Sequence, residues 1–228
     1  MDVNIAGAGV NAHVEAQVDP TSSAVRASLR PLEYTSPGGV LGGHYAISTM
    51  TGLMAAGIAS AAQVFQVRWA DPSKLFILKK LVVQCSTATG FAATTLGAPL
   101  ELIIGHGSTA NGSSGTALAP TGISNRLRQT MAATAFSTSG EIRIATTAAL
   151  TAATGQTLEP APVGTCAGAD NRTLVSTSQM ALWEQRDAGA HPLILNTGDT
   201  LVVRTNSPAA TGTWYAFFTM EWVESVSY

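Results

Sequence analysis

The sequence is poor in charged residues. Asp, Glu, Lys and Arg make up 11% of the chain, whereas an ordinary soluble domain contains about 25%. The chain has 12 basic and 14 acidic residues. No cationic surface is therefore expected, and nucleic acid is not predicted as a partner. Charged residues are depleted at buried interfaces, so this composition favours a protein covered by neighbours in an assembly. A monomer with a surface of Thr and Ser is the less favoured alternative.

Cysteine is also scarce. The chain has two, Cys85 and Cys166, and neither has the neighbouring Cys or His that a zinc or redox motif requires. Cys85 lies in an apolar run and is expected to be a buried small hydrophobic residue, whereas Cys166 lies in a Gly- and Ala-rich loop. Two free thiols are therefore favoured over a disulfide. Asp2 stands where a signal peptide needs positive charge, so secretion is not predicted.

Strongly hydrophobic stretches are missing as well. Residues 44–66 contain no charged side chain, but polar residues interrupt them and much of the remainder is Ala and Gly. These residue types contribute little to membrane insertion. We therefore expect no membrane span and no membrane partner.

Motifs for catalysis and metal binding are absent. No serine lies in a G-x-S-x-G motif. Glu221 and Glu224 flank Trp222 at an odd separation, which places them on opposite faces of a strand and argues against a glycosidase pair. Four histidines stand in separate segments without the spacing of metal ligands, namely His13, His44, His106 and His191. The prediction is a protein that is not an enzyme, with no catalytic, cofactor-binding or metal-binding residues.

What the sequence does contain is a series of short apolar runs separated by turn residues. Phe65, Val67 and Trp69 share one face of an alternating run, and Ile142 and Ile144 share one face of another. The strands expected in this way cover residues 40–52, 64–69, 74–87, 100–104, 141–145 and 180–184, followed by further runs between residues 191 and 224. About eight strands with turns between them predict an all-β fold. An antiparallel two-sheet sandwich of jelly-roll type is the favoured form, and a related barrel is the alternative.

The last of these runs, residues 214–224, holds an unusual share of the aromatic residues. It is predicted to be a buried central strand. One face would carry Phe218, Met220 and Trp222, and the other Phe217, Thr219 and Glu221. Core packing is favoured over a sugar-binding platform for the four tryptophans, Trp69, Trp183, Trp214 and Trp222.

Three stretches depart from the simple strand pattern. Lys79 and Lys80 interrupt an apolar run, which predicts a β-bulge or a strand whose charges reach solvent. Residues 55–62 are rich enough in alanine for a helical turn. A short helix at residues 22–29 is an alternative to extended chain.

The chain divides into an N-terminal arm, residues 1–38, and a β-sandwich domain, residues 39–228. Residues 1–29 contain no Phe, Trp or Tyr, so they have little with which to build a core and are expected to form an extended arm that becomes ordered against a neighbour. Two long loops, residues 108–122 and 146–169, are candidate contact surfaces, because loops of this length are uncommon in compact domains unless they bind something.

Several motifs after residue 38 resemble tailed-bacteriophage virion proteins. They are Gly42-Gly43-His44-Tyr45, Phe65-Gln66-Val67-Arg68-Trp69 with Asp71-Pro72-Ser73, Leu182-Trp183-Glu184, Asp187-Ala188-Gly189-Ala190-His191-Pro192-Leu193, Gly198-Asp199 and Glu221-Trp222. The resemblance implies a capsid decoration (cement) protein on the virion surface. Such a protein is commonly a homotrimer, binds the major capsid protein and uses an N-terminal arm to reach across capsid joints. The same class of fold also serves in tail, baseplate and head-fibre proteins with a carbohydrate- or receptor-binding role, and this alternative stays open.

Overall fold

The computed structural model describes residues 16–18, 25–27, 42–55, 58–93, 99–120, 125–127, 133–169, 179–185, 191–206 and 209–226. Most of the predicted arm, residues 1–38, lies outside them. Within it, β1 (Ala16–Val18) and β2 (Val25–Ala27) pair with each other in antiparallel register. The helical alternative for residues 22–29 is therefore wrong at residues 25–27, where a β-branched valine starts a strand.

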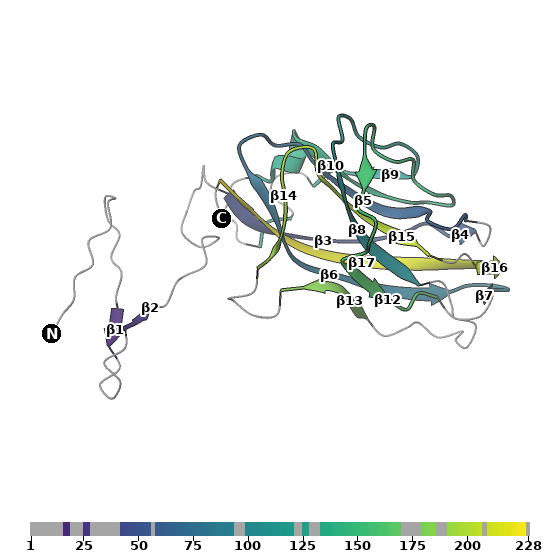
Figure 1. The fold of residues 1–228 in the computed structure, drawn as a ribbon. Coiled ribbons are helices and arrows are strands. Elements are labelled where there is room, and N and C mark those ends of the chain that lie inside the picture. Colours follow the sequence, from purple (N-terminus) through teal and green to yellow (C-terminus); the bar gives the residue numbers. More distant parts are fainter. Residues whose placement is uncertain are drawn as a thin grey trace.

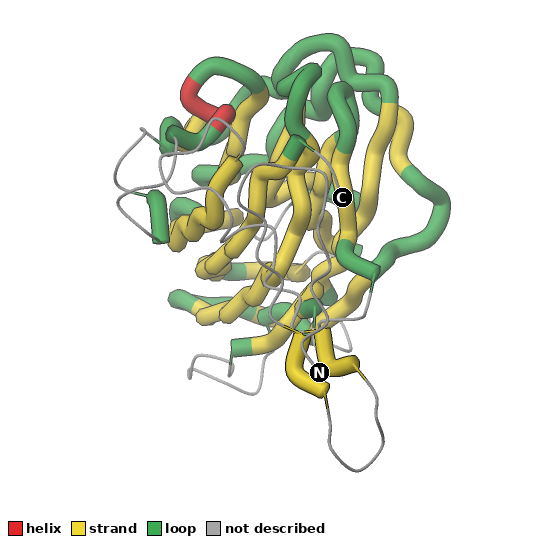
Figure 2. Tube along the Cα trace, turned by 90° about the vertical axis from the view of Figure 1, so that its left-hand side faces the viewer, coloured by secondary structure: helices red, strands yellow, loops and turns green. Residues whose placement is uncertain are grey.

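Two antiparallel sheets pack face to face as a sandwich that is not closed into a barrel, which confirms the predicted fold class (Figure 1). Strands dominate the described chain, and its helical structure is one short 3-10 helix, η2 (Ala135–Ser137), drawn red in Figure 2. The strands of five residues or more are β3 (Gly42–Met50), β5 (Gln63–Trp69), β6 (Leu75–Thr87), β8 (Leu100–His106), β10 (Gly140–Ile144), β13 (Met180–Glu184), β15 (Thr200–Thr205) and β17 (Thr213–Ser225).

Sheet 1 has the strand order β13-β6-β17-β3, and sheet 2 has the order β8-β15-β5-β10. Along the chain the long strands alternate between the two sheets except at β8 and β10, an arrangement compatible with the jelly-roll type. Short strands extend the sheets, namely β4 (Met54–Ala55) and β14 (Leu193–Leu195) in sheet 1, and β9 (Thr116–Leu118), β11 (Thr157–Leu158) and β12 (Gly164–Cys166) in sheet 2. A further pair is β7 (Ala92–Ala93) with β16 (Ala209–Thr211).

Strand β17 is the centre of sheet 1, as predicted. It pairs with β3 on one side and with β6 on the other along most of its length. Phe218, Met220 and Trp222 are buried in the core, while Phe217 and Glu221 on the opposite face are partly exposed. The alternation of residue types along the last apolar run therefore gives the correct orientation of the strand.

An aromatic cluster fills one end of the space between the sheets. Trp222 stacks on Tyr45, with ring centroids 5.4 Å apart, and meets the edge of Phe136 at 5.6 Å. Trp69 contacts Phe76 at 5.7 Å. Each such ring pair adds about 0.5–1.5 kcal/mol to the stabilisation from burial. The cluster joins both sheets to η2, which contributes Phe136.

A β-bulge at Lys79 confirms the prediction for the two lysines. Across the ladder Glu221 faces Lys80 and Trp222 faces Leu78, so Lys79 is the extra residue of β6. An extra residue resets the alternation of a strand. Leu78 and Leu81 can therefore both point into the core although three positions separate them, and the two lysines between them are only partly buried.

The alanine-rich stretch at residues 55–62 is not helical where the structure describes it. Ala55 belongs to β4, and residues 58–62 form a hydrogen-bonded turn. The Ala61 N–H donates to the carbonyl of Thr205, and the Thr205 N–H donates to the carbonyl of Ala62. Pairing with a distant strand thus overrides the helix propensity of alanine. Within the described ranges, no helix has the length and hydrophobicity needed to cross a bilayer.

The two long loops pack on each other over the outer face of sheet 2. The Thr109 N–H donates to the carbonyl of Thr154 at 2.8 Å, and the Thr151 N–H donates to the carbonyl of Ser113 at 2.9 Å. Beneath them Gln66 of β5 is buried although it points away from the core. The two loops therefore cover the outer face of sheet 2 at Gln66.

Candidate functional site

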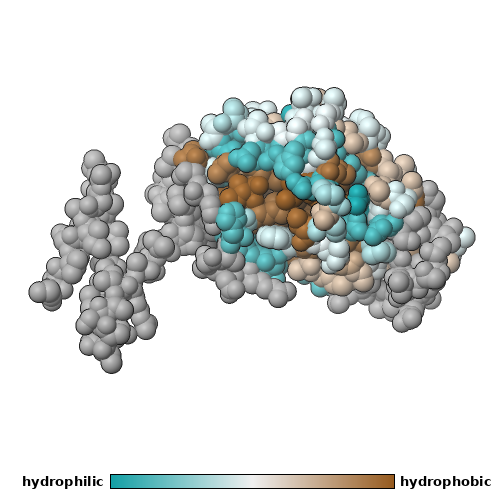
Figure 3. All heavy atoms as spheres, in the orientation of Figure 1, coloured by the Kyte–Doolittle hydropathy of each residue, from teal (hydrophilic) through white to brown (hydrophobic). Residues whose placement is uncertain are grey.

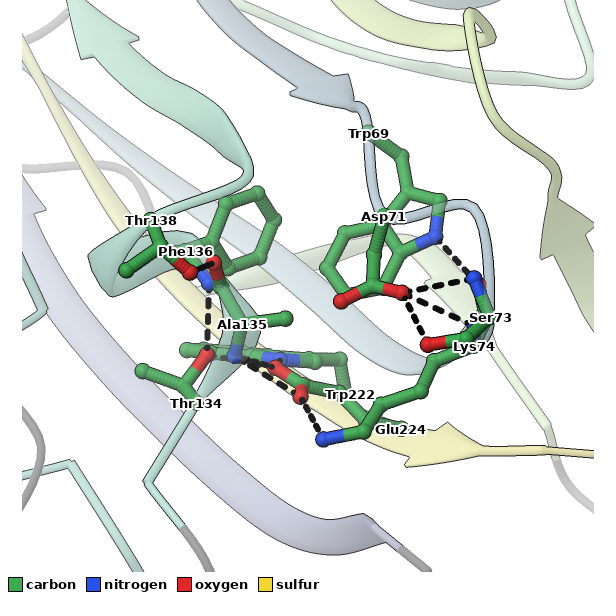
Figure 4. A network of polar contacts seen from close by, with 10 residues as sticks. All are labelled: Trp69, Asp71, Ser73, Lys74, Thr134, Ala135, Phe136, Thr138, Trp222 and Glu224. Carbon is green, nitrogen blue, oxygen red and sulfur yellow. Dashed lines mark hydrogen bonds and ion pairs between the residues drawn. The ribbon is translucent and has the colours of Figure 1, made fainter.

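The most densely bonded polar group in the described structure is a buried carboxylate at the aromatic end of the sandwich (Figure 4). Glu224 of β17 accepts a short hydrogen bond from the Thr134 hydroxyl and one of 3.1 Å from Nε1 of Trp222. The Ala135 N–H lies 2.9 and 3.1 Å from the two carboxylate oxygens. Lys74 places its Nζ 3.9 Å from Oε2. Both oxygens of the carboxylate therefore have donors within the protein.

This arrangement indicates a structural role for Glu224. Burial raises the pKa of its carboxyl group, and the donors from Thr134, Ala135 and Trp222 oppose that shift only in part. The carboxylate holds the N-terminus of η2, where Thr134 is the N-cap. Because η2 carries Phe136 into the aromatic cluster, Glu224 fixes the position of a core residue. Its oxygens are occupied, which leaves no acceptor directed at a substrate.

A tight turn after β5 positions the lysine of this network. Oδ1 of Asp71 accepts hydrogen bonds from the Ser73 N–H and hydroxyl at 2.8 Å each, and from the Lys74 N–H at 3.0 Å. Burial works against ionisation of Asp71, but these donors outweigh it and lower the pKa of the carboxyl group. Nε1 of Trp69 donates to the carbonyl of Lys74 at 2.7 Å. The turn thus ties the end of β5 to the core and directs Lys74 towards Glu224.

Two hollows in the described surface are smaller than the roughly 300–1,000 Å³ of typical ligand sites. One, of about 250 Å³, is lined by Pro72, Ser73, Lys74, Leu75, Asn196, Thr197 and Val226. The other, of about 270 Å³, is lined by Ala55, Ile58, Ala59, Thr147, Ala148 and Ala149. Neither set contains a histidine or a carboxylate.

His106 has carboxylate partners that sequence spacing did not reveal. Its Nδ1 lies 2.8 Å from Asp199, and its Nε2 lies 2.9 Å from Glu159. These hydrogen bonds, first that of Asp199 and then that of Glu159, raise the pKa of the imidazole. The partners are 93 and 53 residues away in sequence, so the strand pairing brings them together. Each ring nitrogen therefore has a carboxylate oxygen at hydrogen-bonding distance.

The remaining histidines do not join this group. His44 lies in β3 with its Nε2 3.9 Å from Glu221, and His191 precedes β14. His13 lies outside the described residues. In the part of the chain that the structure describes, no group of three or more His, Cys, Asp and Glu side chains is arranged to hold a metal ion.

Both cysteines are free thiols, which confirms the prediction. Cys85 is buried in β6, and Cys166 of β12 is partly buried against the same core. Burial raises the pKa of Cys85 to about 12 and that of Cys166 to about 11. Because the thiolate is the reactive form, neither residue has the character of a catalytic nucleophile.

The tryptophans are mainly core residues. Trp69, Trp214 and Trp222 are at most 1% exposed, which confirms core packing for these three and removes them from any sugar-binding surface. Trp183 of β13 is partly exposed, but its Nε1 is buried and makes no hydrogen bond with a described residue. Glu221 and Glu224 lie on opposite faces of β17, as predicted from their separation.

The exposed surface offers apolar contact points. Met50 and Phe217 are paired neighbours on β3 and β17, with 49% and 39% of their surface exposed. On the side of the molecule drawn in Figure 3, hydrophobic residues gather in a continuous area bordered by hydrophilic ones. Apolar surface of this kind is typical of contact sites for other molecules.

No protein-family model matches the chain, and no curated protein or solved structure matches it.

Proposed function

We propose that the chain is a non-enzymatic virion structural protein, a capsid decoration (cement) protein that binds the major capsid protein and bridges its subunits. One observation carries the proposal. The polar groups that the described structure brings together, at Glu224 and at His106, are saturated by contacts within the fold, whereas the outward surfaces are sparsely charged loops and exposed apolar side chains. These features favour binding to other proteins over catalysis.

The composition supports an assembly, which we propose to be a homotrimer. Residues 113–117, which lead into β9, and residues 146–148, which follow β10, are exposed and contain no charged side chain. Loops on a rigid scaffold commonly carry binding function. We propose that these loops, together with residues 1–29, make contacts between subunits and with the capsid.

Imaging of purified virions by cryo-electron microscopy tests the proposal. Density for the sandwich over the joints between major capsid subunits is the expected result. Location in the tail alone, or absence of the chain from the particle by mass spectrometry, would contradict the capsid role.

Deletion of residues 1–29 is expected to leave the sandwich folded but to weaken assembly. The reason is that residues 1–29 contain no Phe, Trp or Tyr and therefore have little with which to build a core. The melting transition of the truncated chain should stay cooperative, while sedimentation should show a lower oligomer fraction at equal concentration. Full-length protein at the same dilution is the control, since assembly makes thermal stability depend on concentration. Loss of the cooperative transition in the truncated chain would show that the arm belongs to the fold.

A tail, baseplate or head-fibre protein that binds carbohydrate is the second candidate, and the partly exposed Trp183 is the observation that favours it. The exposed part of an aromatic ring can pack on the apolar face of a sugar. Binding of the full chain on a glycan array, lost on Trp183→Ala and kept on Phe217→Ala, would favour this candidate over the capsid role.

A further inference from the structure

His106 joins three separate elements of sheet 2. It is the last residue of β8, Asp199 lies in the turn before β15, and Glu159 follows the edge strand β11. The ring bridges the two carboxylates through opposite nitrogens, at 2.8 and 2.9 Å. Its side chain is 51% exposed, so solvent protons reach it.

The number of hydrogens on the imidazole ring determines whether both hydrogen bonds to the carboxylates can form. A carboxylate oxygen only accepts hydrogen bonds, so each ring nitrogen must carry a hydrogen to bond to its carboxylate. A neutral imidazole carries one hydrogen and an imidazolium carries two. Both contacts are therefore attractive only when His106 is protonated. In the neutral ring, one nitrogen lone pair faces a carboxylate oxygen at hydrogen-bonding distance and repels it.

The two carboxylates differ in how firmly they are held. Asp199 has a side chain 15% exposed, accepts the Asn196 N–H at 2.8 Å through its second oxygen, and is tied to Trp69 by its backbone. Glu159 has a side chain 45% exposed and is attached to β8 through the two-residue ladder of β11 and its own N–H, which donates to the carbonyl of Ile104 at 2.8 Å.

We propose that His106 is a pH-operated latch at the edge of sheet 2. When protonated, it holds Glu159, at the end of β11, to the end of β8 and to the turn before β15, and when neutral it releases Glu159. On deprotonation Nε2 loses its hydrogen, Nδ1 keeps the bond to Asp199, and the edge strand β11 loses its side-chain anchor. This inference does not depend on the proposed virion function, because every group in it belongs to one chain.

The charges around the imidazole ring favour its protonated form. Asp199 and Glu159 are the charged groups in contact with His106 among the described residues. Arg68 of β5 lies in the same region, but its guanidinium group donates hydrogen bonds to Ser108 and Asn111. The two carboxylates raise the pKa of His106, Asp199 more than Glu159. A raised pKa in the folded state gives a stabilisation that is complete below the pKa of an unfolded histidine, about 6.5, and is lost as the pH rises through the folded value.

The test is an NMR titration of the full chain with nitrogen-15 detection of the histidine rings. His106→Asn identifies the resonance by its disappearance. We expect His106 to titrate above about 6.5 and to become the Nδ1-protonated tautomer at high pH. As the pH rises through the same range, the hydrogen-exchange protection factor of the Glu159 amide should fall. The protection factor corrects for the intrinsic effect of pH on exchange.

Two variants separate the latch from an ordinary surface histidine. Glu159→Gln should move the pKa of His106 towards its usual value and remove the pH dependence of protection at residue 159. Glu184→Gln is the matched control, because Glu184 pairs with Lys80 on the other sheet, and it should change neither. An unshifted titration of His106, a high-pH tautomer protonated on Nε2, or protection that is constant with pH would overturn the proposal.

Discussion

Replacing Glu224 with alanine is expected to lower the free energy of unfolding by about 3–5 kcal/mol, the usual cost of breaking a buried, paired charge. The substitution leaves the Thr134 hydroxyl, the Ala135 N–H and the Trp222 indole N–H without their acceptor. It also leaves Lys74 without its opposite charge. Each buried donor left unpaired costs about 1–3 kcal/mol by itself. Equilibrium unfolding in urea measures the loss.

The control for this prediction lies three residues earlier on the same strand. Glu221 has a side chain 38% exposed, and Nε2 of His44 lies 3.9 Å from its carboxylate. Exposed pairs contribute at most about 1 kcal/mol, so Glu221→Ala should change stability little. Glu224→Gln should fall between the two, because it retains one acceptor oxygen. Equal losses for Glu224→Ala and Glu221→Ala would show that the buried network does not hold the end of the sandwich.

Trp222→Ala should be destabilising by a similar amount, about 3–5 kcal/mol, as is typical for the loss of a buried tryptophan. The side chain is completely buried. It contacts the rings of Tyr45, Phe76 and Phe136, so its removal opens a cavity where β3, β6 and η2 meet. The measurement is again chemical denaturation, with the denaturant midpoint and slope fitted separately.

A double-mutant cycle measures the coupling between Trp222 and Glu224 and so tests this second prediction further. Because the Trp222 indole donates to Glu224, the effects of Trp222→Ala and Glu224→Ala should not add, and the coupling energy should be about 0.5–3 kcal/mol. Phe217→Ala is the control on the same strand, since Phe217 is 39% exposed on the opposite face and should cost much less than Trp222→Ala. Strict additivity, or an equal cost for Phe217→Ala, would refute the proposed arrangement of the core.

Side-chain alternation was enough to predict the sandwich. Phe65, Val67 and Trp69 point inward, as their spacing indicates, because a strand has a period of two residues and only one face is buried. The bulge at Lys79 was predictable for the same reason. Two consecutive lysines in an apolar strand would otherwise place one charge in the core, and an unpaired buried charge is costly.

The polar networks were not predictable, because their members are brought together by topology. Thr134 and Glu224 are 90 residues apart in sequence, and the segment around η2 is rich in Ala, Thr and Ser and has no apolar period. The partners of His106 are likewise distant. Residues 108–122 and 146–169 were predicted as loops from their composition, but they contain the short strands β9, β11 and β12. These strands and the contacts between the two segments use backbone groups, which leave no pattern in the side chains.

The central place of β17 has a consequence for the order of folding. Residues 213–225 are synthesised after every other strand described here, yet β3 and β6 meet only through them. Sheet 1 therefore has to close late, by contacts between residues far apart along the chain, which makes closure slow. Until then β3 and β6 present open edges, the kind of surface through which incomplete chains join one another.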